Sequence, residues 1–253
     1  MQALFVLSSL IATASIWAAG PKYGPADRPF AEPVSRSHAY LQTHPAPDFW
    51  TLMPFYAGQR WPYSCSAASV TMLLNAALRA GRTLDDDARN FDEESTLRSA
   101  GVNGWSARMS RRGAPKRQPP KHGLTLQLLG EAVTRSLERN GVRGSTISAV
   151  QVSEASPSLL AELRGVLSEN EKGSRDFVLA HFCQDALTDA PGGPFPHIAP
   201  VGAYDEEGRR VLIMDVDREW YEPYWVDDAR LLEAMSRRTE PFGYGGWVRA
   251  SLP

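Results

Sequence analysis

One stretch of the sequence, Tyr63 to Arg79, constrains the fold more than any other. Its apolar residues recur at intervals of three and four, which predicts a helix with one continuous buried stripe. The stripe consists of Val70, Leu73, Leu74, Ala77 and Leu78. Cys65 lies at the expected start of this helix, where unpaired backbone N–H groups and the helix dipole favour the reactive thiolate. The alternative interpretation is a small thiol packed in the core.

Composition limits the classes of protein that this chain can belong to. With 253 residues, of which 43% are hydrophobic, the chain can bury a full core and build one domain with extensions. A formal net charge of −2 gives no electrostatic reason to expect nucleic acid or an anionic membrane as a partner. Two cysteines make neither a disulfide framework nor a cysteine-only zinc site.

The first residues are typical of a targeting segment. An apolar run from Ala3 to Ile11 precedes a small-x-small pattern at Ala12 to Ala14, although no Lys or Arg comes before Lys22. We therefore predict a signal peptide or N-terminal anchor at residues 1–20, and a periplasmic or secreted protein. A mis-assigned start or a buried N-terminal helix is the alternative. Residues 21–48 are expected to be an irregular lead-in, and residues 49–253 the main domain.

The rest of the pattern predicts helices first and strands afterwards. Helices are expected at 124–139, from Pro157 to Leu167, and at about 228–236, and strands at 177–182, 197–204, 210–216 and 246–250. This order indicates an α+β fold with an antiparallel sheet. The charged, proline-containing segment from Arg82 to Lys121 is expected to be a solvent-facing loop, and whether it acts as a lid is left open.

Three residues form a candidate catalytic group. His197 begins one strand of an expected hairpin and Asp215 ends the next, so the two should be neighbours. If the sheet packs on the helix, Cys65 lies at the same end, giving a nucleophile, a base and an orienting carboxylate. Gln59 would add an oxyanion donor, although a solvent-facing glutamine is the alternative. A structural histidine and a turn-forming aspartate explain the other two residues equally well.

The motifs around these residues resemble those of the phytochelatin synthase family. The resemblance runs from about Phe49 to the C-terminus and is strongest from His197 to Val226. The segments that carry the resemblance are Cys65 to Ser69, Leu74-Asn75-Ala76, His197 to Tyr204 and Leu212 to Arg218, continuing to Tyr221, Pro223 and Trp225-Val226. The chain departs from the family in having Ser66-Ala67 where Gly-Pro is usual, and in lacking the cysteine-rich C-terminal extension.

The resemblance implies a papain-like cysteine transferase acting on glutathione and related thiol peptides. It implies Cys65 as nucleophile, His197 as base, Asp215 as orienting group and Gln59 as oxyanion donor. Arg218 and Tyr221 would contact the substrate. The enzyme would cleave the Cys–Gly bond and pass the γ-glutamylcysteinyl group to water or to a second glutathione, as in phytochelatin synthesis during a heavy-metal response.

This chemistry requires no cofactor and no protein metal site, although Cd²⁺ or Zn²⁺ could enter as a thiolate complex of the substrate. The protein would contact a membrane only through the N-terminal anchor. Whether it forms a homodimer is left open. Two other functions also remain open: a papain-like peptidase acting on other peptides, and a non-catalytic secreted protein with the same fold. Cys183 is expected to be a buried free thiol.

Overall fold

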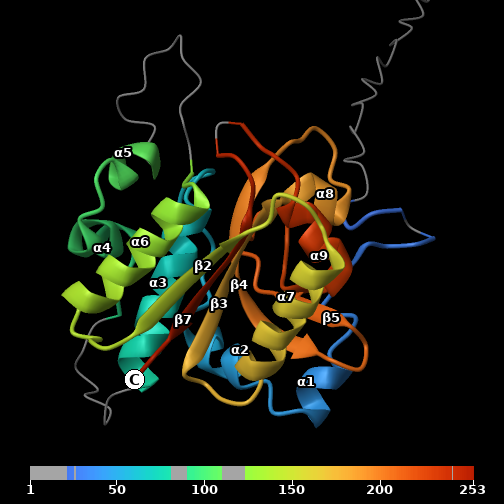
Figure 1. Ribbon diagram of the computed structural model, residues 1–253, viewed down its shortest axis with the longest axis horizontal. Helices are drawn as coiled ribbons and strands as arrows, with labels where there is room; N and C mark the ends of the chain where they lie inside the picture. Colours follow the sequence, from blue (N-terminus) through green and yellow to red (C-terminus); the bar gives the residue numbers. More distant parts are fainter. Residues whose placement is uncertain (1–21, 26, 81–89, 110–122, 241) are drawn as a thin grey trace, which may run out of the picture.

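The computed structural model describes the chain except for residues 1–21, 26, 81–89, 110–122 and 241 (Figure 1). The expected signal peptide or anchor therefore lies outside the described residues. Within the part that is described, no helix combines the length and the apolar character needed to cross a membrane.

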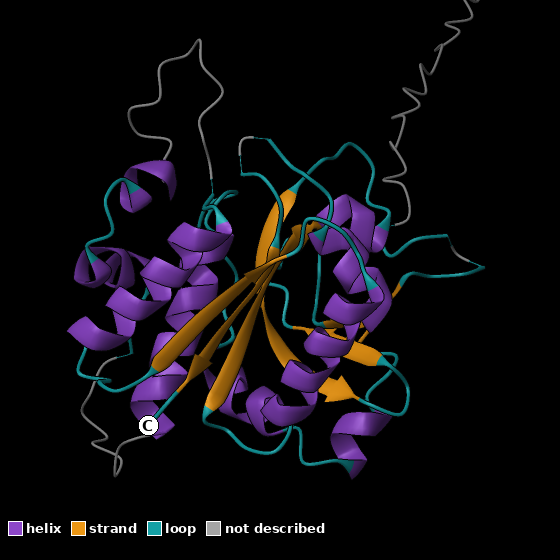
Figure 2. Ribbon diagram, in the orientation of Figure 1, coloured by secondary structure: helices purple, strands orange, loops and turns teal. Residues whose placement is uncertain are grey.

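In the described part of the chain, seven strands form one sheet in the order β1-β6-β5-β4-β3-β7-β2. Every neighbouring pair is antiparallel, as the sequence predicts (Figure 2). The strands are β1 (Ala31–Pro33), β2 (Thr146–Gln151), β3 (Asp176–Cys183), β4 (Pro196–Asp205), β5 (Arg210–Ile213), β6 (Tyr224–Asp227) and β7 (Gly246–Ser251).

Helices cover both faces of this sheet (Figure 1). On one side are α3 (Cys65–Ala80) and α6 (Leu126–Arg139), with α4 (Glu93–Ala100) and α5 (Trp105–Met109) outside them. On the other side are α7 (Pro157–Asn170), α8 (Gln184–Thr188) and α9 (Asp228–Met235). The short helices α1 (Ala39–Thr43) and α2 (Pro47–Leu52) and a 3-10 turn (Met53–Phe55) lead into α3. The chain is thus an α+β protein with its sheet between two helical layers.

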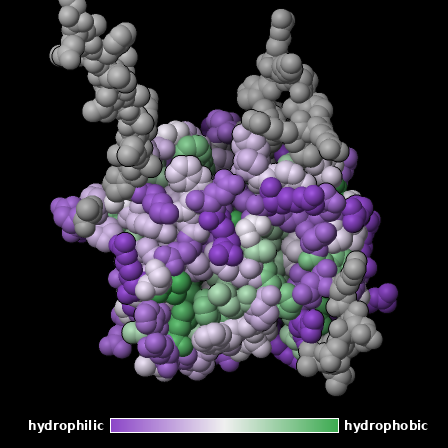
Figure 3. Space-filling model, turned by 180° about the vertical axis from the view of Figure 1, so that it is seen from behind, coloured by the Kyte–Doolittle hydropathy of each residue, from purple (hydrophilic) through white to green (hydrophobic). Residues whose placement is uncertain are grey.

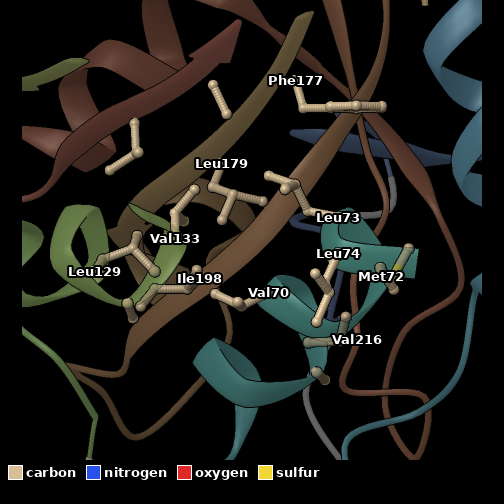
Figure 4. Close-up of a cluster of buried hydrophobic side chains, with 14 of the residues drawn as sticks. Val70, Met72, Leu73, Leu74, Leu129, Val133, Phe177, Leu179, Ile198 and Val216 are labelled. Atoms are coloured by element: carbon tan, nitrogen blue, oxygen red, sulfur yellow. The ribbon is translucent and has the colours of Figure 1, made fainter. Parts of the chain in front are cut away.

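Helix α3 lies in the centre of one layer, and every residue from Cys65 to Ala77 is buried. Figure 4 shows its Val70 and Leu73 among side chains of β3, β4 and α6. A hydroxyl on the first turns also contacts the sheet, because Ser69 Oγ donates to the carbonyl of Ile198 at 3.0 Å. Small side chains at the start of the helix permit this close approach to β4. The helix predicted from the periodicity is confirmed, but it is buried on all sides from Cys65 to Ala77 and not only along the predicted stripe.

The sequence predictions for the remaining helices α6, α7 and α9 and for strands β3, β4 and β7 are also confirmed. Three expectations were wrong. The lead-in is not irregular, because its strand β1 pairs with β6 at one edge of the sheet. The middle of the charged segment is not a loop, because it contains α4 and α5, which bury Leu97 and Trp105 against the core. Its residues 82–89 and 110–121, and with them the question of a lid, lie outside the described residues. The strand expected to reach residue 216 ends at Ile213, so Asp215 follows it in a loop.

The surface is not uniformly polar. Seen from behind, hydrophilic side chains form a band across the upper half of the molecule, and hydrophobic side chains gather below it (Figure 3). Five large apolar side chains in the described residues are more than a third exposed: Trp50, Met53, Tyr63, Phe195 and Trp220. Three of these lie within five residues of Cys65, His197 or Asp215 in the sequence, so exposed aromatic groups accompany each predicted site residue.

A buried carboxyl group supports the junction of α2 and α7. Asp48 is 1% exposed, and its Oδ2 accepts a hydrogen bond from the amide of Asn170. Its Oδ1 has no partner among the described residues. Burial raises the pKa of Asp48 to about 9, and the charges of Glu171 and Asp176 act in the same direction. Asp48 is therefore protonated in the folded protein at neutral pH.

Because its pKa is higher in the folded chain than in the unfolded one, Asp48 makes the protein less stable as the pH rises. The folded state binds one more proton than the unfolded state between about pH 4 and pH 9. We predict that Asp48→Asn gains stability relative to the wild type by about 1.4 kcal/mol per pH unit across this range. Urea unfolding at pH 5, 6, 7 and 8 measures the difference. A difference that does not change with pH would contradict the assignment.

Candidate active site

Cys65 lies at the first residue of α3 and is 7% exposed. Two serines of the first turns hold this end of the helix. Ser66 Oγ accepts a hydrogen bond from the indole of Trp105 at 3.1 Å, and Ser69 bonds to β4 as described above. The thiol therefore has a fixed position at a helix N-terminus, next to the strand that carries His197.

His197 and Asp215 form the polar centre of the site. The ring Nε2 of His197 lies 2.9 Å from Oδ1 of Asp215, and both side chains are buried. Cys65 is close enough to contribute both a hydrogen-bonding and a charge interaction to His197. With Nε2 engaged by the carboxylate, Nδ1 is the ring nitrogen left for the sulfur. The structure thus brings together the three residues that the sequence singles out.

The electrostatics of this group favour a charged imidazole. Burial on its own lowers the pKa of His197, because it disfavours the imidazolium. The charge of Asp215 and its hydrogen bond outweigh this effect, and Cys65 adds to them, so the pKa of His197 lies well above its ordinary value. A protonated His197 can pair with a thiolate and can later supply a proton to a leaving group.

Asp215 is held by several groups besides His197. Its Oδ1 also accepts from the backbone N–H of Asp217 at 2.8 Å, and its Oδ2 accepts from the hydroxyl of Tyr224 at 2.9 Å. The hydroxyl of Tyr56 donates to the backbone carbonyl of Asp215 at 2.6 Å. Both carboxylate oxygens are therefore hydrogen-bonded, and the backbone is fixed as well.

The loop that carries Gln59 runs beside the segment after Asp215. The backbone N–H of Gln59 donates to the carbonyl of Val216 at 2.7 Å. The guanidinium of Arg218 lies over the ring of Tyr56, with 5.0 Å between its central carbon and the ring centroid, and the start of its side chain packs beside Gly58. Gln59 and Arg218 thus belong to two chain segments that are joined next to Asp215.

The side-chain amide of Gln59, beside the segment after Asp215, does not use all of its hydrogen-bonding groups. Its Nε2 donates to the carbonyl of Pro62 at 3.3 Å, and its Oε1 has no partner within the described residues. One N–H of the amide remains available to a ligand. An oxyanion role for Gln59 stays a prediction.

Tyr221 and Cys183 have other surroundings. The hydroxyl of Tyr221 lies 3.2 Å from Oγ1 of Thr188, and the side chain is 8% exposed, so its substrate contact stays a prediction. Cys183 is a buried free thiol, as expected, and donates to Oδ1 of Asp185 at 3.1 Å. Burial raises the pKa of Cys183 to about 11, with the hydrogen bond to Asp185 next in size, so it stays a neutral thiol.

Sequence reasoning missed Tyr224, Gln184 and Tyr56, which hold the candidate triad from outside. No expected strand covers Tyr224, so its place on β6, which pairs with β5, is seen only in the folded chain. Ile213 is its register partner, and Asp215 lies two residues farther along the chain, in the loop after β5 and within reach of the Tyr224 hydroxyl. No pattern in the sequence indicates Tyr56, because its contact with Asp215 joins segments 159 residues apart.

We predict that Asp215→Asn lowers the pKa of His197, because the larger of the effects that oppose burial is removed and that of Cys65 remains. The titration of the His197 ring protons, followed by NMR and assigned with a His197→Gln variant, measures this change. Asp217→Asn is the matched control, since that carboxylate lies nearby without a hydrogen bond to the ring. Equal midpoints in the wild type and in Asp215→Asn would show that the carboxylate does not control the imidazole.

Comparison with known proteins agrees with the resemblance seen in the motifs. A model of the phytochelatin synthase family matches residues 36–241, which include all of the site residues discussed above. Proteins named glutathione gamma-glutamylcysteinyltransferase 1 from Triticum aestivum and Lotus japonicus are 26% and 25% identical over 196 residues. These alignments cover 77% of this chain and 34% of each relative, so the chain spans about a third of their length. The chain belongs to the phytochelatin synthase family.

Proposed function

We propose that this protein is a papain-like acyltransferase that cleaves the Cys–Gly peptide bond of glutathione. The observation that carries the proposal is the buried Asp215–His197 pair beside a cysteine at a helix N-terminus. That arrangement supplies a nucleophile, a proton carrier and an orienting carboxylate. The names of the relatives supply the substrate, since they are glutathione gamma-glutamylcysteinyltransferases.

In the first step, the thiolate of Cys65 attacks the carbonyl carbon of the Cys–Gly bond. The oxyanion that forms would be stabilised by the backbone N–H of Cys65 and the side-chain amide of Gln59. The C–N bond then breaks, and His197 gives its proton to the departing amine. The products are free glycine and a γ-glutamylcysteinyl thioester on Cys65.

In the second step, His197 takes a proton from the acceptor as it attacks the thioester. Attack by water gives γ-glutamylcysteine, whereas attack by the amine of a second glutathione gives a short phytochelatin. Either reaction regenerates the Cys65 thiol. Arg218, the cation next to the Gln59 loop, is proposed to bind a substrate carboxylate. Cd²⁺ or Zn²⁺ would act only as thiolate complexes of the substrate.

The N-terminal residues support a place for this reaction outside the cytoplasm. A signal peptide or anchor at residues 1–20 would deliver the domain to the periplasm or the exterior. Cys65 must stay reduced there for the reaction to proceed. Both cysteines are free in the folded chain, and Cys183 is engaged with Asp185.

We predict that the purified protein releases glycine from glutathione, and that Cys65→Ser lowers the rate by at least about a thousandfold, because a serine hydroxyl is a far weaker nucleophile here. Free glycine, measured by mass spectrometry with and without Cd²⁺, is the readout. Cys183→Ser is the matched control, since it makes the same change at a thiol outside the proposed chemistry, and its rate should stay within twofold of the wild type.

The substrate needs its own control. The α-linked isomer of glutathione has the same atoms and the same Cys–Gly bond, but its glutamyl residue is attached through the other carboxyl group. Selective release from the γ-linked peptide supports the proposal. Equal release from both isomers would favour the general peptidase, and glycine release that persists in Cys65→Ser would end the assignment.

A further inference from the structure

We infer that Tyr224 is a positioning residue of this site, which fixes the Asp215 carboxylate and through it the ring of His197. The expected effect of Tyr224 on kcat rests on the proposed function. The structural part of the inference does not: one phenol hydroxyl, aligned by Gln184, determines which way the Asp215 carboxylate faces.

The hydrogen bonds leave Tyr224 only one direction for its proton. Its hydroxyl lies 2.9 Å from Oδ2 of Asp215 and 3.0 Å from Nε2 of Gln184. The amide nitrogen of Gln184 can only donate, so it occupies a lone pair of the phenol oxygen. The amide oxygen of Gln184 is farther away, at 3.4 Å. The phenol proton therefore points to Asp215.

The surroundings keep that proton in place. Tyr224 is fully buried, with 0% of its surface exposed. Burial raises the pKa of Tyr224 well above its ordinary value, and the charge of Asp215 acts in the same direction. The phenol thus remains a hydrogen-bond donor throughout the pH range in which the protein is folded and active. The backbone of Gln184 is itself fixed. Its N–H donates to the backbone carbonyl of Phe195, and its backbone carbonyl accepts from the hydroxyl of Thr188.

The two oxygens of Asp215 have different tasks, and this makes Tyr224 more than a packing residue. Oδ1 serves His197 and the backbone N–H of Asp217, whereas Tyr224 is the donor recorded for Oδ2. Without the phenol hydroxyl, Oδ2 is a buried acceptor with no other donor among the described residues, and the carboxylate gains by rotating toward another one. Such rotation would move Oδ1 and loosen the ring that must meet the sulfur of Cys65.

The experiment compares Tyr224→Phe with Tyr204→Phe. Tyr204 is a matched control because it is also buried, and its hydroxyl donates to another buried carboxylate, Asp228, at 2.8 Å. We expect Tyr224→Phe to lower kcat for glycine release by about tenfold to a hundredfold, with KM within twofold of the wild type. Tyr204→Phe should leave both constants unchanged, while both variants lose a comparable amount in Tm.

A second readout does not depend on activity. The proton between His197 Nε2 and Asp215 should give a downfield NMR signal that exchanges slowly with water. We expect this signal in the wild type and in Tyr204→Phe, and its broadening or loss in Tyr224→Phe. Gln184→Leu, which frees the phenol proton to turn away, should give the same signature with a smaller loss in kcat. That variant decides the question if Tyr224→Phe does not fold.

The outcomes separate the two proposals. If the wild type releases no glycine, and Tyr224→Phe loses the His197 signal while Tyr204→Phe keeps it, the proposed function is wrong and the positioning role stands. If Tyr224→Phe keeps the signal and a kcat within twofold of the wild type, the inference is overturned while the function remains. A loss in Tyr204→Phe equal to that in Tyr224→Phe also overturns it, because the effect is then one of general stability.

Discussion

The buried carboxylate of Asp215 is the feature on which the candidate site depends. A charge removed from water costs several kcal/mol unless donors and a partner of opposite charge surround it. At Asp215 those groups come from three places: His197 on β4, the backbone N–H of Asp217 in the following loop, and Tyr224 on β6. These groups meet only when β4, β5 and β6 pair in one register. The geometry of the site therefore depends on the register of the sheet, and a shift in that register would separate the groups around Asp215.

The helix that carries Cys65 is held to the same register by a contact close to both partners. Ser69 is four residues after the cysteine, and its hydroxyl binds the carbonyl of Ile198, the residue after His197. A shift of α3 along the sheet by one turn would break this bond and would move the thiol away from the imidazole. The small residues Ala67 and Ala68, both buried, allow the helix to come near enough for the bond to form.

The sequence predicts the central part of this fold because strong local periodicity and burial agree there. Helix α3 and strands β3 and β4 are long, apolar and regular, so their type and position could be predicted. Strand β1 could not, since it has three residues and exists only because β6 offers it an open edge. Helix α4 was not predicted because charged residues dominate its segment, although a capping box at Asp92 marks its start.

The residues of the candidate site divide in the same way into those that the sequence predicts and those that it does not. Cys65, His197 and Asp215 could be inferred, because a helix start and the two ends of a hairpin are readable from spacing. The groups that hold them are not: Tyr56 and Gln184 reach the site from distant segments, and any tyrosine or glutamine in the chain has the same chemistry. What distinguishes them is their place in the folded chain, which non-local strand pairing decides.

A comparison of two histidines shows how much the carboxylate contributes. His181 and His197 lie on neighbouring strands, one position apart in register, and both are buried. Burial lowers the pKa of His181 to about 4, with the charge of His197 adding to the effect, and its Nδ1 has no partner in the described part of the chain. The pKa of His197 moves in the opposite direction under the same burial, chiefly because Asp215 is beside it. Burial alone would leave two neutral imidazoles in this sheet. The oriented carboxylate is what makes one of them a cation that can pair with a thiolate.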